Sequence, residues 1–142
     1  LSTSPCTDMS VQGEVLNLLA EVQARSGVAI VIITHNLNLV RHVTDQMAIM
    51  YLGRFVEQGP TEQVFAHPRH PYTKALLAAN PEPDPEARQE RVALSGEVPS
   101  PVDRPSGCDF HPRCPWARES CAAREPDWSV EDSRGHRCLF PL

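Results

Sequence analysis

The sequence has no block of basic residues, no long hydrophobic run and no recognisable leader. Its formal net charge is −5, with 13 Lys and Arg against 18 Asp and Glu, which argues against a nucleic-acid-binding surface. No apolar run approaches the ~18 residues that span a bilayer, and residues 1–10 lack the charged segment and apolar core of a secretory signal. We therefore expect a cytosolic protein that binds no nucleic acid and does not cross a membrane unaided.

The apolar residues that are present are unevenly distributed. Almost every Val, Ile and Leu run lies in residues 11–79, whereas residues 81–142 are rich in proline. Pro81, Pro83 and Pro85 alternate, which excludes a helix or a central strand and is typical of an extended spacer. We predict three regions: an α/β part over residues 1–79, a Pro-rich linker over 80–105, and a coil-rich, cysteine-containing extension over 106–142.

The most apolar stretch is Val28-Ala-Ile-Val-Ile-Ile33, which predicts a strand buried on both faces, as in a parallel sheet. His35 lies just past the carboxyl end of this run, at the edge where open α/β sheets bind ligands. On spacing alone His35 is either a ligand-contacting residue or a histidine that only hydrogen-bonds its neighbours. One buried strand cannot stand without neighbours, and residues 1–10 show no strand pattern. We therefore expect a chain that starts within a domain.

Helical and hairpin patterns surround this strand. Apolar residues at helical spacing predict an amphipathic helix that Ser10 caps and Gly27 stops. Asn36 is a suitable N-cap for the next helix. We further expect a hairpin of strands over 46–51 and 54–58, a short helix over 61–66, and a last helix over 71–79 that begins at Pro71.

Several segments together resemble one family. The run Ile32-Ile33-Thr34-His35-Asn36-Leu37 and the later Met50-Tyr51-Leu52-Gly53-Arg54 are similar to the end of an ABC transporter ATPase, a P-loop NTPase. Three further segments narrow the resemblance to the C-terminal part of dipeptide/oligopeptide importer ATPases. These are His67-Pro-Arg-His-Pro-Tyr-Thr-Lys-Ala-Leu-Leu77, Gly96-Glu-Val-Pro-Ser-Pro101 and Gly107-Cys-Asp-Phe-His-Pro-Arg-Cys-Pro115. The resemblance covers residues 8–142 in the family's order.

The resemblance implies roles for two residues. His35 occupies the position of the switch (H-loop) histidine, which contacts the γ-phosphate of ATP. A neutral imidazole can donate to a phosphate oxygen and help to orient the attacking water, in a reaction that depends mostly on positioning and electrostatics. Asp8 matches the D-loop aspartate, which in the family lies across the dimer interface, although Pro5-Cys6-Thr7 departs from the family's pattern before it.

The family's other nucleotide-binding motifs are absent from these 142 residues. There is no G-x-x-x-x-G-K-[ST] phosphate loop, and hence no backbone cradle or lysine for the phosphates. No apolar strand ending in Asp-Glu precedes Asp8, so the magnesium-binding aspartate and the catalytic glutamate are missing too. We expect that this chain alone neither binds ATP and magnesium tightly nor hydrolyses ATP.

For the whole protein the resemblance implies an ATP-binding subunit that couples ATP binding and hydrolysis to peptide import. Such a subunit is cytoplasmic and peripheral on the inner face of the cell membrane. Its partners are membrane permease subunits, a second ATPase subunit and, indirectly, a peptide-binding protein. The alternative is a non-catalytic metal-binding or iron–sulfur module with the α/β part as a remnant.

Four of the five cysteines lie in the last 35 residues with the spacing C-x5-C-x6-C-x16-C: Cys108, Cys114, Cys121 and Cys138. A segment with so few apolar residues needs a disulfide or a bound metal to hold it in an ordered structure. A cytosolic location disfavours disulfides, and the tight knuckles of structural zinc are missing, although His111 and His136 could serve as ligands. An iron–sulfur cluster tolerates wider spacing, and the ATPases that this chain resembles can carry a [4Fe-4S] cluster on four cysteines in this region. Zinc and unliganded thiols stay open as alternatives.

Overall fold

The computed structural model describes residues 8–80, 94 and 96–142, with side chains from residue 13 onward. The predicted proline spacer at 81–85 lies outside the described residues, as does Pro5-Cys6-Thr7. In the described ranges, every helix is too short or too polar to span a membrane. The elements in chain order are α1 (Asp8–Ser26), α2 (Leu37–Val43), β1 (Gln46–Tyr51), β2 (Arg54–Pro60), α3 (Thr61–Ala66), α4 (Pro71–Ala79), the 3₁₀ turn η1 (His111–Arg113), α5 (Glu119–Ala123), β3 (Ser129–Glu131) and β4 (Arg134–His136).

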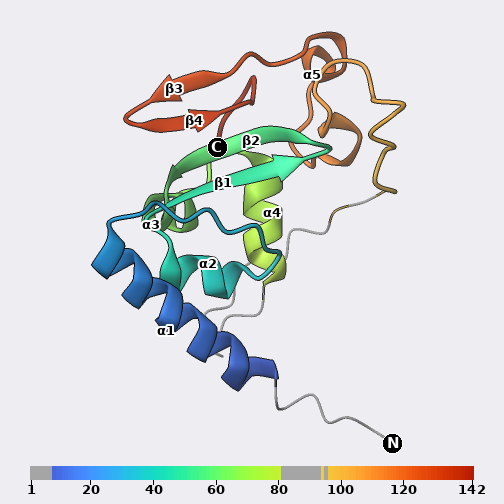
Figure 1. Ribbon diagram of the computed structural model, residues 1–142. Helices are drawn as coiled ribbons and strands as arrows, with labels where there is room; N and C mark the ends of the chain where they lie inside the picture. The colour runs from blue at the N-terminus through green and yellow to red at the C-terminus, as the bar shows by residue number, and fades with distance from the viewer. Residues whose placement is uncertain (1–7, 81–93, 95) are drawn as a thin grey trace, which may run out of the picture.

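The centre of the fold is one antiparallel sheet with the strand order β1-β2-β4-β3 (Figure 1). A two-residue turn joins β1 to β2, with φ of 45° at Leu52 and 78° at Gly53. Positive φ at both positions is the type I′ geometry that matches the twist of a hairpin. Strand β4 pairs with β2, Glu57 opposite His136. The C-terminal extension, which the sequence predicted to be coil-rich, thus adds two short strands to the hairpin's sheet.

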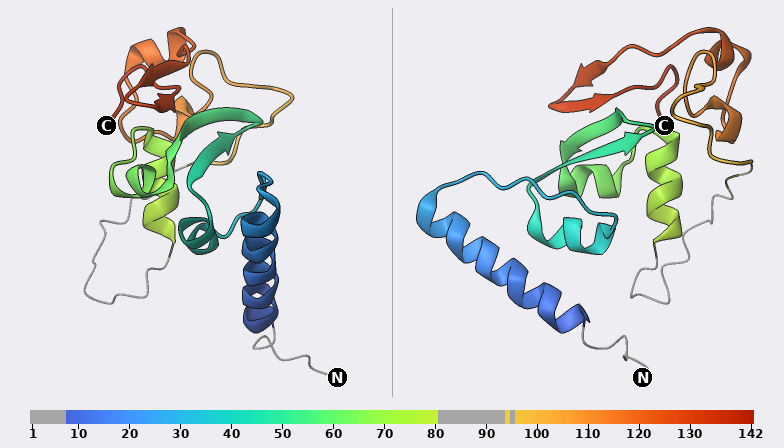
Figure 2. Two further views of the ribbon diagram at one scale, coloured as in Figure 1. Left: turned by 60° about the vertical axis from the view of Figure 1, so that its left-hand side comes forward. Right: turned by 45° about the vertical axis from the view of Figure 1, so that its right-hand side comes forward.

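The hydrophobic core lies between this sheet and the short helices. In β1 exposed and buried residues alternate, as expected for a strand with one face on a core. Figure 2 shows α2, α3 and α4 gathered below the hairpin. From the extension, Phe110 is 1% exposed and lies edge-on to Tyr51, with ring centroids 5.3 Å apart. The buried cluster comprises Leu37, Met47, Ile49, Tyr51, Val56, Val64, Leu77 and Phe110.

The predicted strand over residues 28–33 is wrong for this structure. The segment is an irregular connection between α1 and α2, and Val31 and Ile33 are 88% and 98% exposed. The reason is that a central parallel strand depends on hydrogen-bonding neighbours on both sides, whereas the sheet described here is antiparallel and complete without it. The left view of Figure 2 shows α1 and the connection along one side of the molecule.

Most local predictions are confirmed. Gly27, at φ 65°, ends α1 and donates its N–H to Gln23 O at 2.9 Å, while α1 begins at Asp8 rather than after Ser10. The Asn36 side chain caps α2 by accepting the Leu39 N–H at 3.1 Å. The hairpin, α3 and α4 have the predicted positions, except that β2 continues to Pro60.

Candidate functional site

His35 lies in an exposed turn immediately before α2. Thr34 Oγ1 accepts the N–H of Asn36 at 3.1 Å, and Asn36 in turn caps the helix, so the turn has a defined backbone. The structure therefore places the His35 imidazole in solvent at the start of α2. It does not place it at the end of a formed strand, because residues 28–33 are not paired into a sheet.

Asp8 is the first residue of α1, and its side chain lies outside the described part of the chain. For Asp8 the structure gives only the backbone conformation, which is helical. Its assignment as the D-loop aspartate therefore stays a prediction.

The four C-terminal cysteines belong to one tightly turned segment. Cys108 donates its N–H to Cys121 O at 2.8 Å, which closes the loop between them. Gly107, at φ 71°, makes this closure possible, since a Cβ there would lie 2.3 Å from Cys121 O. Cys108, Cys114, Cys121 and Cys138 are half-buried and none forms a disulfide.

The thiols influence one another electrostatically. The pKa of Cys138 is raised to about 11, first by burial, with smaller contributions from the other three thiols and an opposing hydrogen bond from the Phe140 backbone. Burial likewise raises the pKa of Cys108 and of Cys114. These three thiols are therefore protonated near neutral pH. Among the described residues, no three His, Cys, Asp or Glu side chains gather closely enough to hold a metal ion, so this geometry gives the zinc and iron–sulfur alternatives no support.

A buried carboxylate ties the extension to the hairpin. Glu57 is fully buried and accepts the backbone N–H groups of Arg69 and His70 at 2.8 and 2.9 Å. Arg134 of β4 donates to the same carboxylate at 2.7 Å and to His67 O at 2.5 Å. Because a buried charge is stable only when it is paired and hydrogen-bonded, Glu57 fixes β2, β4 and the loop before α4 relative to one another.

The sequence did not single out Glu57 or Arg134. The two residues are 77 positions apart, and a single charged residue within a partly exposed strand gives no sign of burial. Only information on which distant positions lie in contact would have identified Glu57 and Arg134 as a pair. His70 caps α4, since its Nδ1 accepts the Tyr72 N–H at 3.1 Å at the start of that helix.

Comparison with known proteins shows which proteins this chain is similar to. Residues 56–121 match the family model described as "Oligopeptide/dipeptide transporter, C-terminal region". This range includes most of β2, all of α3 and α4, Phe110 and three of the four cysteines. The match confirms the resemblance found in the sequence: the chain is similar to the C-terminal part of peptide ABC transporter ATP-binding proteins.

Three curated relatives illustrate the match. A probable peptide ABC transporter ATP-binding protein of Sinorhizobium fredii is 53% identical over 92% of this chain and 37% of its own length. The dipeptide transport ATP-binding protein DppF of Haemophilus influenzae is 50% identical over 84% of this chain and 36% of its length. The di/tripeptide transport ATP-binding protein DppF of Pseudomonas aeruginosa is 44% identical over 92% and 41%. The chain thus spans between 36% and 41% of the length of these relatives.

Proposed function

We propose that this chain is the C-terminal part of an ATP-binding subunit that couples ATP binding and hydrolysis to the import of di- or oligopeptides. The observation that carries the proposal is the 53% identity over 92% of the chain to a peptide ABC transporter ATP-binding protein. The phosphate loop and the magnesium-binding residues are not among these 142 residues. The chain then works with ATP and magnesium only as part of a whole ATPase.

In that whole ATPase, His35 is the switch residue. The exposed apolar side chains of Val31 and Ile33 support this role, because they are the surface that neighbouring parallel strands would cover. Pairing of residues 28–33 into such a sheet would bring His35 to the ligand-binding edge. Asp8, at the start of α1, takes the dimer-interface position.

The partners and location follow from the same assignment. The subunit acts from the cytoplasmic face of the membrane, against permease subunits that span it and beside a second ATPase subunit. A peptide-binding protein delivers the peptide on the opposite face.

The test joins this chain to the missing motifs. The N-terminal part of the Sinorhizobium relative is fused before residue 8, in place of that protein's own C-terminal part. We expect ATPase activity in the fusion and none in the 142-residue chain. His35→Ala should lower the rate on the order of 100-fold, the usual loss for one donor to a developing oxyanion.

The matched control is His42→Ala, since His42 is an exposed histidine of α2 with no proposed role. Two results would contradict the proposal. One is ATP hydrolysis by the 142-residue chain that His35→Ala removes, and the other is an active fusion whose rate is the same with and without His35.

A second candidate function is a metal-held staple on Cys108, Cys114, Cys121 and Cys138. What favours it is the chemistry of the donor set: four free thiols in one segment, of which the other three contribute to the raised pKa of Cys138. A bound [4Fe-4S] cluster or zinc ion would stabilise the segment, since metal binding is coupled to folding and to thiol deprotonation. Because the thiols do not gather as ligands in the described structure, binding would have to draw them together.

Elemental analysis of anaerobically purified protein tests this candidate. Iron and acid-labile sulfide near 4 per chain, lost in Cys114→Ser, would support the cluster, and one zinc per chain with no sulfide would support zinc. Protein with neither metal and with all five cysteines titratable as thiols would reject both. Cys6→Ser is the control, because Cys6 stands far from the other four in the sequence.

A further inference from the structure

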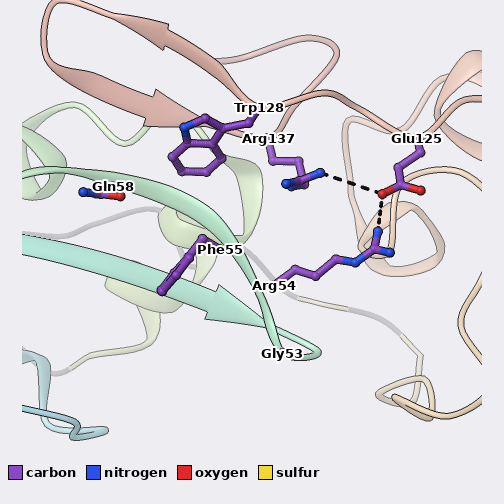
Figure 3. A pocket seen from close by; sticks show the side chains of 7 residues that line it. All are labelled: Gly53, Arg54, Phe55, Gln58, Glu125, Trp128 and Arg137. Atoms are coloured by element: carbon purple, nitrogen blue, oxygen red, sulfur yellow. Dashed lines mark hydrogen bonds and ion pairs between the residues drawn. The ribbon is translucent and has the colours of Figure 1, made fainter.

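A cleft lies between the hairpin and the C-terminal extension, on the face of the sheet away from the core. Its volume is about 570 Å³, within the range of small-molecule sites. Figure 3 shows its two parts. Trp128 and Phe55 stand on one side, and Arg54 and Arg137 converge on Glu125 on the other.

The charged side of the cleft has an excess of cation. Arg54 is hydrogen-bonded to Glu125, while Arg137 Nη1 lies 3.8 Å from the same carboxylate oxygen, an ion pair beyond hydrogen-bond distance. Asp109 pairs with Arg104 at 2.7 Å and with Arg54 at 3.8 Å. Three guanidinium groups thus face two carboxylates, which leaves a local charge of about +1.

Arg137 has more N–H donors than it has partners among the described residues. A guanidinium carries five N–H donors. In Arg137, Nη1 donates to Pro126 O at 3.3 Å and forms the ion pair with Glu125. Its Nε is buried and has no hydrogen-bond partner within the described part of the chain. The Arg137 side chain as a whole is 29% exposed, so its Nη groups, and not the buried Nε, are the donors that can take a further acceptor from the cleft.

The apolar side of the cleft is partly preformed. Trp128 lies directly against β4, since a Cβ on Gly135 would be 2.0 Å from its Cζ2. Phe55 of β2 is 49% exposed, which leaves its ring accessible from the cleft. Two aromatic rings, one of them held by the backbone beneath it, suit a flat apolar group.

We propose that this cleft binds a small organic monocarboxylate that bears a flat apolar group, with the carboxylate on Arg137 and the apolar group against Trp128 and Phe55. The local charge favours one negative charge over two, because a phosphate dianion would also meet Glu125. The C-terminal residue of a short peptide and a free aromatic acid both have this chemistry. The site is separate from the proposed ATP chemistry and does not depend on it.

The test uses the whole 142-residue chain with Trp116→Phe, so that Trp128 is the one remaining tryptophan of two. Its indole N–H signal is followed by NMR during titration with N-acetyl-phenylalanine and with the uncharged N-acetyl-phenylalanine amide. We expect the acid to shift the signal and to bind at least about tenfold more tightly than the amide, because the charge-assisted bonds to Arg137 require the carboxylate. This comparison needs no variant in the cleft.

Further ligands identify the source of the carboxylate. Gly-Gly-Phe that binds at least as tightly as 3-phenylpropanoate indicates a peptide C-terminus, and the reverse order indicates a free aromatic acid. Arg137→Gln should weaken binding of N-acetyl-phenylalanine about tenfold. The control Arg124→Gln should not, because the exposed Arg124 pairs with Asp127 and does not line the cleft.

Three results would overturn the proposal: no shift of the Trp128 signal, equal affinity for acid and amide, or tighter binding of the dianion phenyl phosphate.

Discussion

His70 is a buried histidine that the fold keeps neutral. It is 1% exposed, and its ring lies 5.8 Å from that of Phe110. Its pKa is lowered to about 4, first by burial and second by neighbouring His136, against an opposing hydrogen bond with the Arg137 backbone. The neutral ring is also what the fold needs, because Nδ1 must accept the Tyr72 N–H that begins α4.

The first prediction is a loss of stability in mild acid. The unfolded chain binds a proton at this histidine below pH 6.5, whereas the folded chain does so only below about pH 4. The free energy of unfolding should therefore fall by about 3 kcal/mol between these values and not further below pH 4 through this group. Urea titrations at pH 4, 5, 6 and 7 measure the slope.

His70→Asn is the matched variant, because asparagine keeps a capping acceptor and does not titrate. The variant should show a shallower dependence on pH than the unchanged chain. Equal slopes in the two proteins would show that His70 is not the group responsible.

The second prediction concerns the buried ion pair. Glu57→Gln leaves the Arg134 guanidinium, whose side chain is 7% exposed, without a counter-charge. We expect the free energy of unfolding to fall by about 3–5 kcal/mol, the usual cost of removing one partner of a buried pair. Urea denaturation at pH 7 measures it.

Glu62→Gln is the control, since Glu62 is 74% exposed and 3.9 Å from Arg41. Surface pairs of this kind contribute about 0–1 kcal/mol. If the two variants lost the same stability, Glu57 would not be the tie between β2, β4 and the loop before α4.

At the scale of the elements, a comparison of two glycines distinguishes the effect of backbone conformation from the effect of steric crowding. Gly27 ends α1 at φ 65°, and a Cβ added there would meet no atom within 4 Å, whereas a Cβ on Gly107, at φ 71°, would lie 2.3 Å from Cys121 O. Both positions disfavour a side chain by conformation, but only Gly107 is also closed by a second segment of backbone.

The third prediction is therefore a difference between two alanines. Gly27→Ala should cost about 1 kcal/mol, and Gly107→Ala about 1–3 kcal/mol more because backbone must move. Backbone NMR shifts should change across residues 108–123 in Gly107→Ala and stay near Gly27 in the other variant. Equal losses, with no change near Cys121, would contradict the close packing of this loop.

At the scale of the whole molecule, residues 28–33 are the segment whose sequence and structure disagree. It has the composition of a central strand but lies outside the sheet, with Ile33 98% exposed. A segment of this kind is stable as a strand only when neighbours satisfy its backbone groups.

The fourth prediction is that these residues change state when the rest of an ATPase is supplied. In the 142-residue chain, amides 29–33 should exchange with solvent nearly as fast as in an unfolded peptide. In the fusion described above, exchange should slow at least about 100-fold, because paired backbone groups are protected. Amides of β1 are the control and should be protected in both proteins. Rapid exchange of 29–33 in an active fusion would show that His35 does not stand at a strand end.

The sequence alone determined the elements whose signals are local. The cap at Asn36, the stop at Gly27, the hairpin and the start of α4 at Pro71 all depend on residues within one turn of each other, so their positions could be predicted. The resemblance to peptide-importer ATPases could be found too, because the motifs that carry it are contiguous in the sequence. The tertiary structure decided what depends on distant partners. Glu57 meets Arg134, Phe110 enters the core and the extension joins the sheet only because segments far apart in the chain pack together. The same reason explains the error at residues 28–33: a strand is made by its neighbours, and the described part of this chain supplies none for that segment.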